Sequence, residues 1–178
     1  MSNRNNLIFK GLYIVAWIIF VGLCIEAGAL IVNFIFSIYN PEVVRNLYQK
    51  LDLSEVYNKS KWEYFGVYSF ILFISILKAY LFYLVIRLVS KLDLARPFNS
   101  DVASQITNIS YLIFSIGIIS HVARETVKSL QLRAIDTDAL NPFWADSQAY
   151  ILMAAVVYVI AAIFSRGVEI QNENDLTV

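Results

Sequence analysis

The chain has 178 residues and no formal net charge at neutral pH; hydrophobic residues make up 58% of it and charged residues only 16%. Soluble domains are closer to half apolar and a quarter charged. We therefore expect a large part of the surface of this protein to contact lipid rather than water. The zero net charge argues against direct nucleic-acid binding through phosphate contacts, and a single cysteine, Cys24, excludes an intramolecular disulfide and a cysteine-based metal cluster.

Four long apolar segments follow one another along the chain, at residues 12–39, 64–89, 102–121 and 149–165. A membrane-spanning helix takes about 20 mostly apolar residues, and the first segment is far too long for the apolar part of a cleaved signal peptide. Backbone polar groups inside lipid must be satisfied within each segment, and none of the segments alternates as a barrel strand does. The sequence therefore predicts an all-α polytopic membrane protein, a bundle of four transmembrane helices in a single membrane domain over residues 1–178.

The links before the second and fourth spans are long and carry charged and apolar residues at roughly helical spacing. We expect interfacial helices in both links. These helices either cap the bundle or present residues such as Leu47, Leu51 and Val56 to the membrane surface or to a partner. The short link "SKLDLARPFNS" precedes the third helix and offers Asn99 or Ser100 as its N-cap.

An even number of spans places both chain ends on one side of the membrane. Basic residues divide almost evenly between the two sides, so their number alone gives no orientation. However, the long links pair almost every basic residue with an acidic one, whereas "KGLY", "IRLVSKLDLAR" and "SRG" set basic residues directly at helix ends. These patterns favour a multi-pass protein of the cell membrane with cytoplasmic chain ends.

Ionisable residues inside an apolar span are costly, so Glu26 in the first helix and Lys78 in the second each require a partner. Their depths are similar, and we predict that they pair within the bundle. Small or polar residues also recur on one face of every helix. The predicted polar seam contains Asn33, Ser75, Asn108 and Ser115. Such a seam has two interpretations, hydrogen-bonded packing between helices or a polar pathway through the bundle.

Motifs of soluble catalysis are absent from the sequence, which contains no GxSxG, P-loop, GxGxxG, HExxH or CxxC. The single histidine, His121, lies four residues before Glu125, but one histidine and one carboxylate do not make a metal site. We expect an interfacial histidine, no enzymatic activity, no metal site and no cofactor.

The chain ends in an acidic, amide-rich tail at residues 166–178, "RGVEIQNENDLTV". Arg166 is placed to lie at head-group level, and Glu169 and Glu173 share one helical face. The tail is therefore either a solvated end or a docking segment, and as a docking segment it binds either a small regulator or the inner loop around Pro97 and Phe98. As a docking segment its contact residues are Arg166, Gly167, Glu169, Gln171, Glu173, Asn174, Asp175, Leu176 and Val178.

This tail, together with "RPFNSDV" before the third helix, resembles the bacterial membrane family named domain of unknown function 2975. Ile170 stands where that family usually has leucine. The resemblance implies four spans, a bacterial inner or plasma membrane and, because members are often encoded beside one, a small helix-turn-helix regulator as partner. It implies no catalytic residue. We expect a non-enzymatic signalling or regulatory membrane component, with a small transporter as the alternative; the sequence leaves self-association open.

Overall fold

Four long helices dominate the computed structural model, which describes residues 3–92, 98–133 and 136–175. They are α1 (Asn3–Tyr39), α3 (Lys61–Lys91), α4 (Ser100–Gln131) and α6 (Ser147–Asp175). Each is long and apolar enough to cross a membrane, and these are the four such helices among the described residues. The predicted class, an all-α bundle of four membrane helices, is confirmed.

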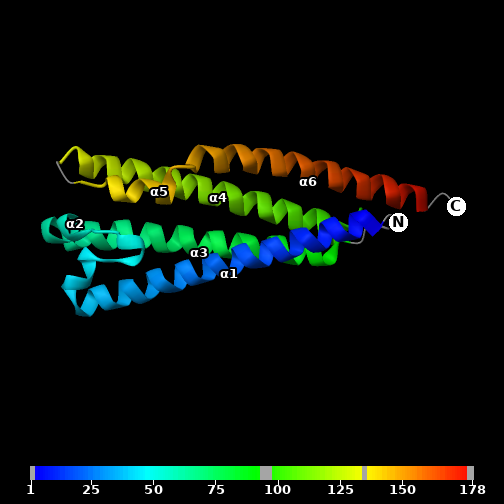
Figure 1. The fold of residues 1–178 in the computed structure, drawn as a ribbon. Helices are drawn as coiled ribbons and strands as arrows, with labels where there is room; N and C mark the ends of the chain where they lie inside the picture. The colour runs from blue at the N-terminus through cyan, green and yellow to red at the C-terminus, as the bar shows by residue number, and fades with distance from the viewer. Residues whose placement is uncertain (1–2, 93–97, 134–135, 176–178) are drawn as a thin grey trace.

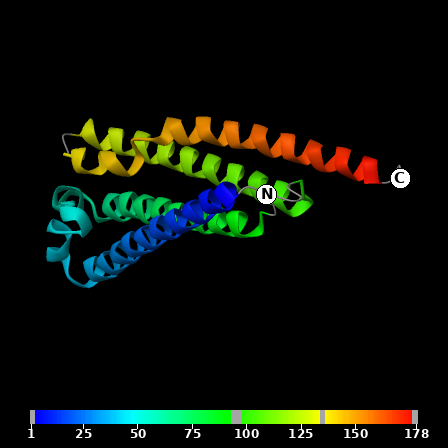
Figure 2. The ribbon, with the colours of Figure 1, turned by 45° about the vertical axis from the view of Figure 1, so that its right-hand side comes forward.

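The helices form two packed pairs, α4 with α6 and α1 with α3, and the pairs meet where α3 packs against α4 (Figures 1 and 2). In the most apolar stretch of each helix, 33% of the residues of α3 and 44% of those of α4 are buried. The corresponding shares are 17% for α1 and 11% for α6. The middle of the molecule is therefore α3 and α4, with α1 and α6 on the flanks. Both ends of the chain lie at one end of the bundle, which we call the terminal end (Figure 1).

The opposite end is closed by the two long links, which fold into one cap. The first link contains η1 (Pro41–Arg45), η2 (Tyr48–Lys50) and α2 (Ser54–Lys59), and the second contains η3 (Asp138–Leu140) and α5 (Asn141–Trp144). Leu47, Leu51 and Val56 are at most 3% exposed in a shared core with Trp144 and the ends of the long helices. Of the two expectations for these leucines and Val56, the capping one holds.

Polar contacts tie the two links of the cap together. The Lys59 ammonium donates to the Arg133 carbonyl at 2.5 Å, and the Arg133 guanidinium pairs with Glu63 at 2.7 Å. The Asp136 backbone N–H donates to the Glu55 carboxylate at 3.2 Å. The cap is consequently one unit built from segments that are distant in the sequence.

The helices run beyond the apolar segments because their ends are set by capping rather than by the edge of the apolar run. Ser60 caps α3 by accepting from the Glu63 N–H, and Asn99 caps α4 by accepting from the Asp101 N–H at 2.8 Å. At its other end α4 continues to Gln131, ten residues past the predicted span, and enters the cap. Similarly, α6 continues through most of the tail to Asp175.

Candidate functional site

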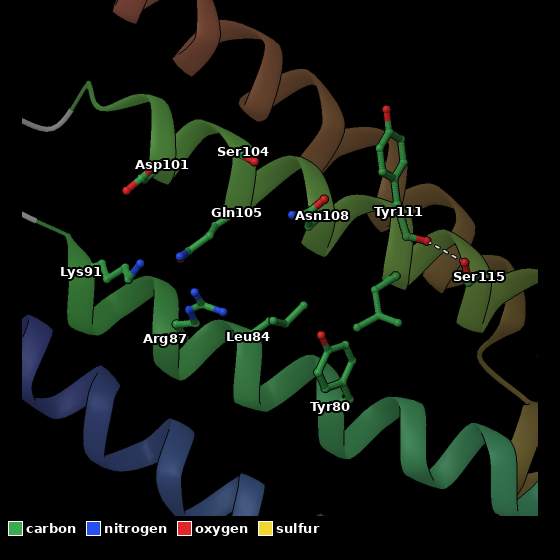
Figure 3. A pocket seen from close by; sticks show the side chains of 11 residues that line it. Tyr80, Leu84, Arg87, Lys91, Asp101, Ser104, Gln105, Asn108, Tyr111 and Ser115 are labelled. Atoms are coloured by element: carbon green, nitrogen blue, oxygen red, sulfur yellow. Dashed lines mark hydrogen bonds between the residues drawn. The ribbon is translucent and has the colours of Figure 1, made fainter.

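A polar groove lies between α3 and α4 at the terminal end and has a volume of about 650 Å³ (Figure 3). We call it the α3–α4 groove. Its polar lining comes from both helices. The residues are Arg87 and Lys91 on α3, and Asp101, Ser104, Gln105 and Asn108 on α4. Tyr80, Leu84 and Leu112 line the part that lies deeper in the bundle.

Charged side chains gather at the mouth of this groove. Figure 3 shows Lys91 and Asp101 on opposite sides of the mouth, with Arg87 one helical turn deeper and the Gln105 amide directed toward it. None of the ion pairs formed by described residues includes Arg87, Lys91 or Asp101. The Gln105 carbonyl oxygen is buried and has no hydrogen-bond partner among the described residues. The groove thus presents two cations, one carboxylate and an amide that the described part of the protein leaves available.

The groove collects part of the predicted polar seam. Asn108 and Ser115 both line it, and the Ser115 hydroxyl is already satisfied by donating to the Tyr111 carbonyl at 2.9 Å. Ser75 is buried on α3 and Asn33 is half-buried on α1, and neither lines the groove. The structure therefore brings together the seam residues of α4 alone.

Glu26 and Lys78 are not joined by an ion pair in the described part of the structure. The Lys78 ammonium instead lies 5.9 Å from the ring centroid of Tyr150 on α6, a cation–π arrangement. Glu26 is half-buried on α1. The prediction of a pair relied on the similar depths of Glu26 and Lys78, but depth alone does not decide toward which neighbouring helix the Lys78 side chain turns.

The tail of the chain contacts Phe98, which lies just before α4. The Phe98 and Phe164 rings lie 5.5 Å apart, and a Cβ atom at Gly167 would collide with the Phe98 ring. Arg166 pairs with Glu169 on the same helix at 2.5 Å, Gln171 is half-buried, and Glu173 and Asn174 also make contacts. Asp175 ends α6. Pro97, Leu176 and Val178 lie outside the described residues.

His121 lies beside Arg124, with 3.4 Å between Nδ1 and Nη2. Glu125 pairs with Lys128 at 3.0 Å and with Arg124 at 3.6 Å rather than with the histidine. Among the described residues no three metal-ligating side chains gather in a group.

The sequence placed the polar face of α4 correctly, with Asn108 and Ser115 in the predicted seam, but it treated Arg87 and Lys91 only as basic residues at a helix end. Asp101 extends the same face of α4, because Asp101, Ser104 and Asn108 recur at spacings of three and four. A polar stripe of this kind, next to a basic helix end, indicates a polar groove.

The fold and this groove define a multi-pass membrane protein with a capped four-helix bundle and a polar groove at the terminal end. Residues 46–178 match the family model described as "Protein of unknown function (DUF2975)", and the chain belongs to that family. The match includes both stretches that carried the resemblance, before α4 and in the tail. No curated protein and no solved structure matches the chain.

Proposed function

We propose that the protein is a non-enzymatic regulatory component of the cell membrane whose tail docks a small cytoplasmic helix-turn-helix regulator. The observation that carries this proposal is the continuity of α6, which runs from the cap at Ser147 through the membrane to Asp175 in the tail. A partner bound to the tail is therefore connected to the membrane-embedded bundle through one helix.

The surface of the tail supports such docking. The Glu169 side chain is 57% exposed although it pairs with Arg166, and Glu173 lies one turn further along the same face. A DNA-binding regulator carries a basic surface, which such acids attract. Affinity from contacts of this kind is reduced by salt.

The orientation with cytoplasmic chain ends is supported by the basic residues near the helix ends at the terminal end. Arg87 and Lys91 lie in the last turns of α3, and Lys10 lies near the start of α1. Basic residues next to the ends of membrane helices are typical of the cytoplasmic side.

The test is affinity purification from membranes with the full chain and with a chain that ends at Arg166. We expect the full chain to recover the helix-turn-helix regulator and the shortened chain to lose it while inserting normally. Glu169→Gln in the full chain should weaken recovery of the regulator, whereas the matched control Glu42→Gln, which changes an exposed acid in the cap, should not. Equal recovery by the shortened chain contradicts the proposal.

The alternative is a small transporter, and the observation that favours it is the polar α3–α4 groove. Toward the cap, however, Ile71, Ile74, Ala123 and Val127 are all at most 2% exposed in an apolar core. This packing supports a groove that opens at the terminal end only. Substrate-dependent flux in proteoliposomes is the measurement that would replace the first proposal with this one.

A further inference from the structure

We propose that the α3–α4 groove binds the headgroup of an anionic phospholipid, with the lipid phosphate held between Arg87, Lys91 and the Gln105 amide. This site is independent of the tail and goes beyond the regulatory role proposed above.

The first argument is charge. Arg87 and Lys91 supply two positive charges and Asp101 one negative charge, so the lining of the groove carries a net charge of one positive unit. None of the three pairs with another described residue. One phosphodiester in a headgroup with no other charge neutralises this lining, whereas a zwitterionic headgroup leaves it positive. Basic pockets between membrane helices bind anionic headgroups on these grounds.

The second argument is the arrangement of donors. The Arg87 guanidinium and the Gln105 amide point toward the same space from opposite helices, and Lys91 lies at the mouth (Figure 3). A guanidinium presents several N–H groups in a plane that fits phosphate oxygens. One turn deeper on α4, Asn108 offers a further amide at the level where the ester carbonyls of a phospholipid follow its phosphate.

The third argument is the change in polarity with depth. The mouth lies where α3 ends and α4 begins, which is the level of the lipid headgroups for helices of this length. Further in, Leu84 and Leu112 line the groove beside Tyr80, Tyr111 and Ser115. The Ser115 hydroxyl is already satisfied by the Tyr111 carbonyl, and this uncharged part of the groove suits the start of an acyl chain. Exposing the polar residues of this groove to acyl chains alone would cost free energy, because their polar groups would lose hydrogen bonds to water. A bound headgroup supplies polar partners and removes that cost.

The experiment uses the purified full chain in a neutral detergent. Native mass spectrometry measures the binding of phosphatidylglycerol, phosphatidylcholine and soluble glycerol 3-phosphate. The variants are Arg87→Gln, Lys91→Gln and Asp101→Asn. The matched control is Lys10→Gln, which removes a cation at the same end of the bundle from the other side of α3.

We expect phosphatidylglycerol to bind more tightly than phosphatidylcholine, and Arg87→Gln and Lys91→Gln each to weaken it about fivefold. Lys10→Gln should leave the affinity unchanged. Asp101→Asn should tighten binding about fivefold, a gain that misfolding cannot produce.

Three results overturn the proposal. Equal affinities for phosphatidylglycerol and phosphatidylcholine would show that the groove does not select an anionic headgroup. A loss of affinity in Lys10→Gln as large as in Arg87→Gln would show that the basic end of the bundle attracts the lipid without a specific site. Binding of glycerol 3-phosphate as tight as that of the lipid makes the groove a site for soluble phosphates.

Discussion

Gly117 occupies a position on α4 where α6 leaves no room for a side chain. A Cβ atom there would lie 2.7 Å from Ile151 Cγ1, 3.1 Å from the Ile151 backbone nitrogen and 3.2 Å from the Ser147 carbonyl oxygen. Two of these three neighbours are backbone atoms, so the helices themselves have to move apart to accept a methyl group. Small residues allow such close approach between membrane helices.

We predict that Gly117→Ala destabilises the bundle by about 1–3 kcal/mol, the usual cost of overpacking. Thermal unfolding in detergent measures the effect. Gly66→Ala on α3 is the matched control, because nothing lies within 4 Å of a Cβ at that position. Alanine is also the better helix former, so the control should be neutral or slightly stabilising. Equal behaviour of the two variants would contradict the close α4–α6 contact.

Asp52 stabilises the start of α2 in the cap. Its carboxylate accepts from the Ser54 backbone N–H at 2.9 Å, and this hydrogen bond is the main reason that the pKa of Asp52 lies below its ordinary value of 3.8. Because the folded-state pKa is the lower one, the stabilisation is present above pH 3.8 and is lost as the pH falls below it toward the folded-state pKa.

We predict that Asp52→Asn makes the unfolding of the cap less dependent on pH below 3.8. Hydrogen exchange of the α2 amides across this range is the measurement, and Asp138→Asn, an exposed acid in the other link of the cap, is the control. An unchanged pH profile in Asp52→Asn would show that this hydrogen bond does not contribute to cap stability.

At the scale of elements, the tail part of α6 contacts the stretch just before α4 through Phe98 and Gly167. Phe98 lies against Gly167 and beside Phe164, which joins the two stretches that carry the family resemblance. The three described atoms nearest to a methyl group at residue 167 would all belong to the Phe98 ring. The two positions should therefore be strongly coupled.

We predict that Gly167→Ala loosens the tail in the native background and has little effect when Phe98→Ala is already present. Limited proteolysis of the tail reports both variants and the double variant. Additive effects in this mutant cycle would mean that residues 98 and 167 do not meet.

At the scale of the whole molecule, the cap and the terminal end should face opposite sides of the membrane. In a Cys24→Ser background, cysteine at exposed Ser90 tests the terminal end and cysteine at exposed Asp138 tests the cap. We expect a membrane-impermeant maleimide to label Asp138→Cys in intact cells and Ser90→Cys only after permeabilisation. The reverse pattern would place the chain ends outside.

Features that depend on local composition could be predicted from the sequence, and features that depend on how helices are rotated could not. Four apolar runs were sufficient to predict four helices, and Asn99 was identifiable as a cap. The orientation of Lys78 toward Tyr150 depends on which face of α3 meets α6. The α3–α4 groove likewise requires that the Arg87 face of α3 and the Asp101 face of α4 be turned toward each other.

Helix α6 also has a mechanical consequence, because it is one unbroken rod held along α4. The Gly117 contact holds it at Ile151, and Ala154 and Ala161 are buried against α4 further along. The part beyond these contacts, from Gly167 to Asp175, is about 12 Å long at about 1.5 Å per residue. Phe98 braces this part at Gly167, so a shift of α6 along α4 is carried by the unbroken helix directly into the tail.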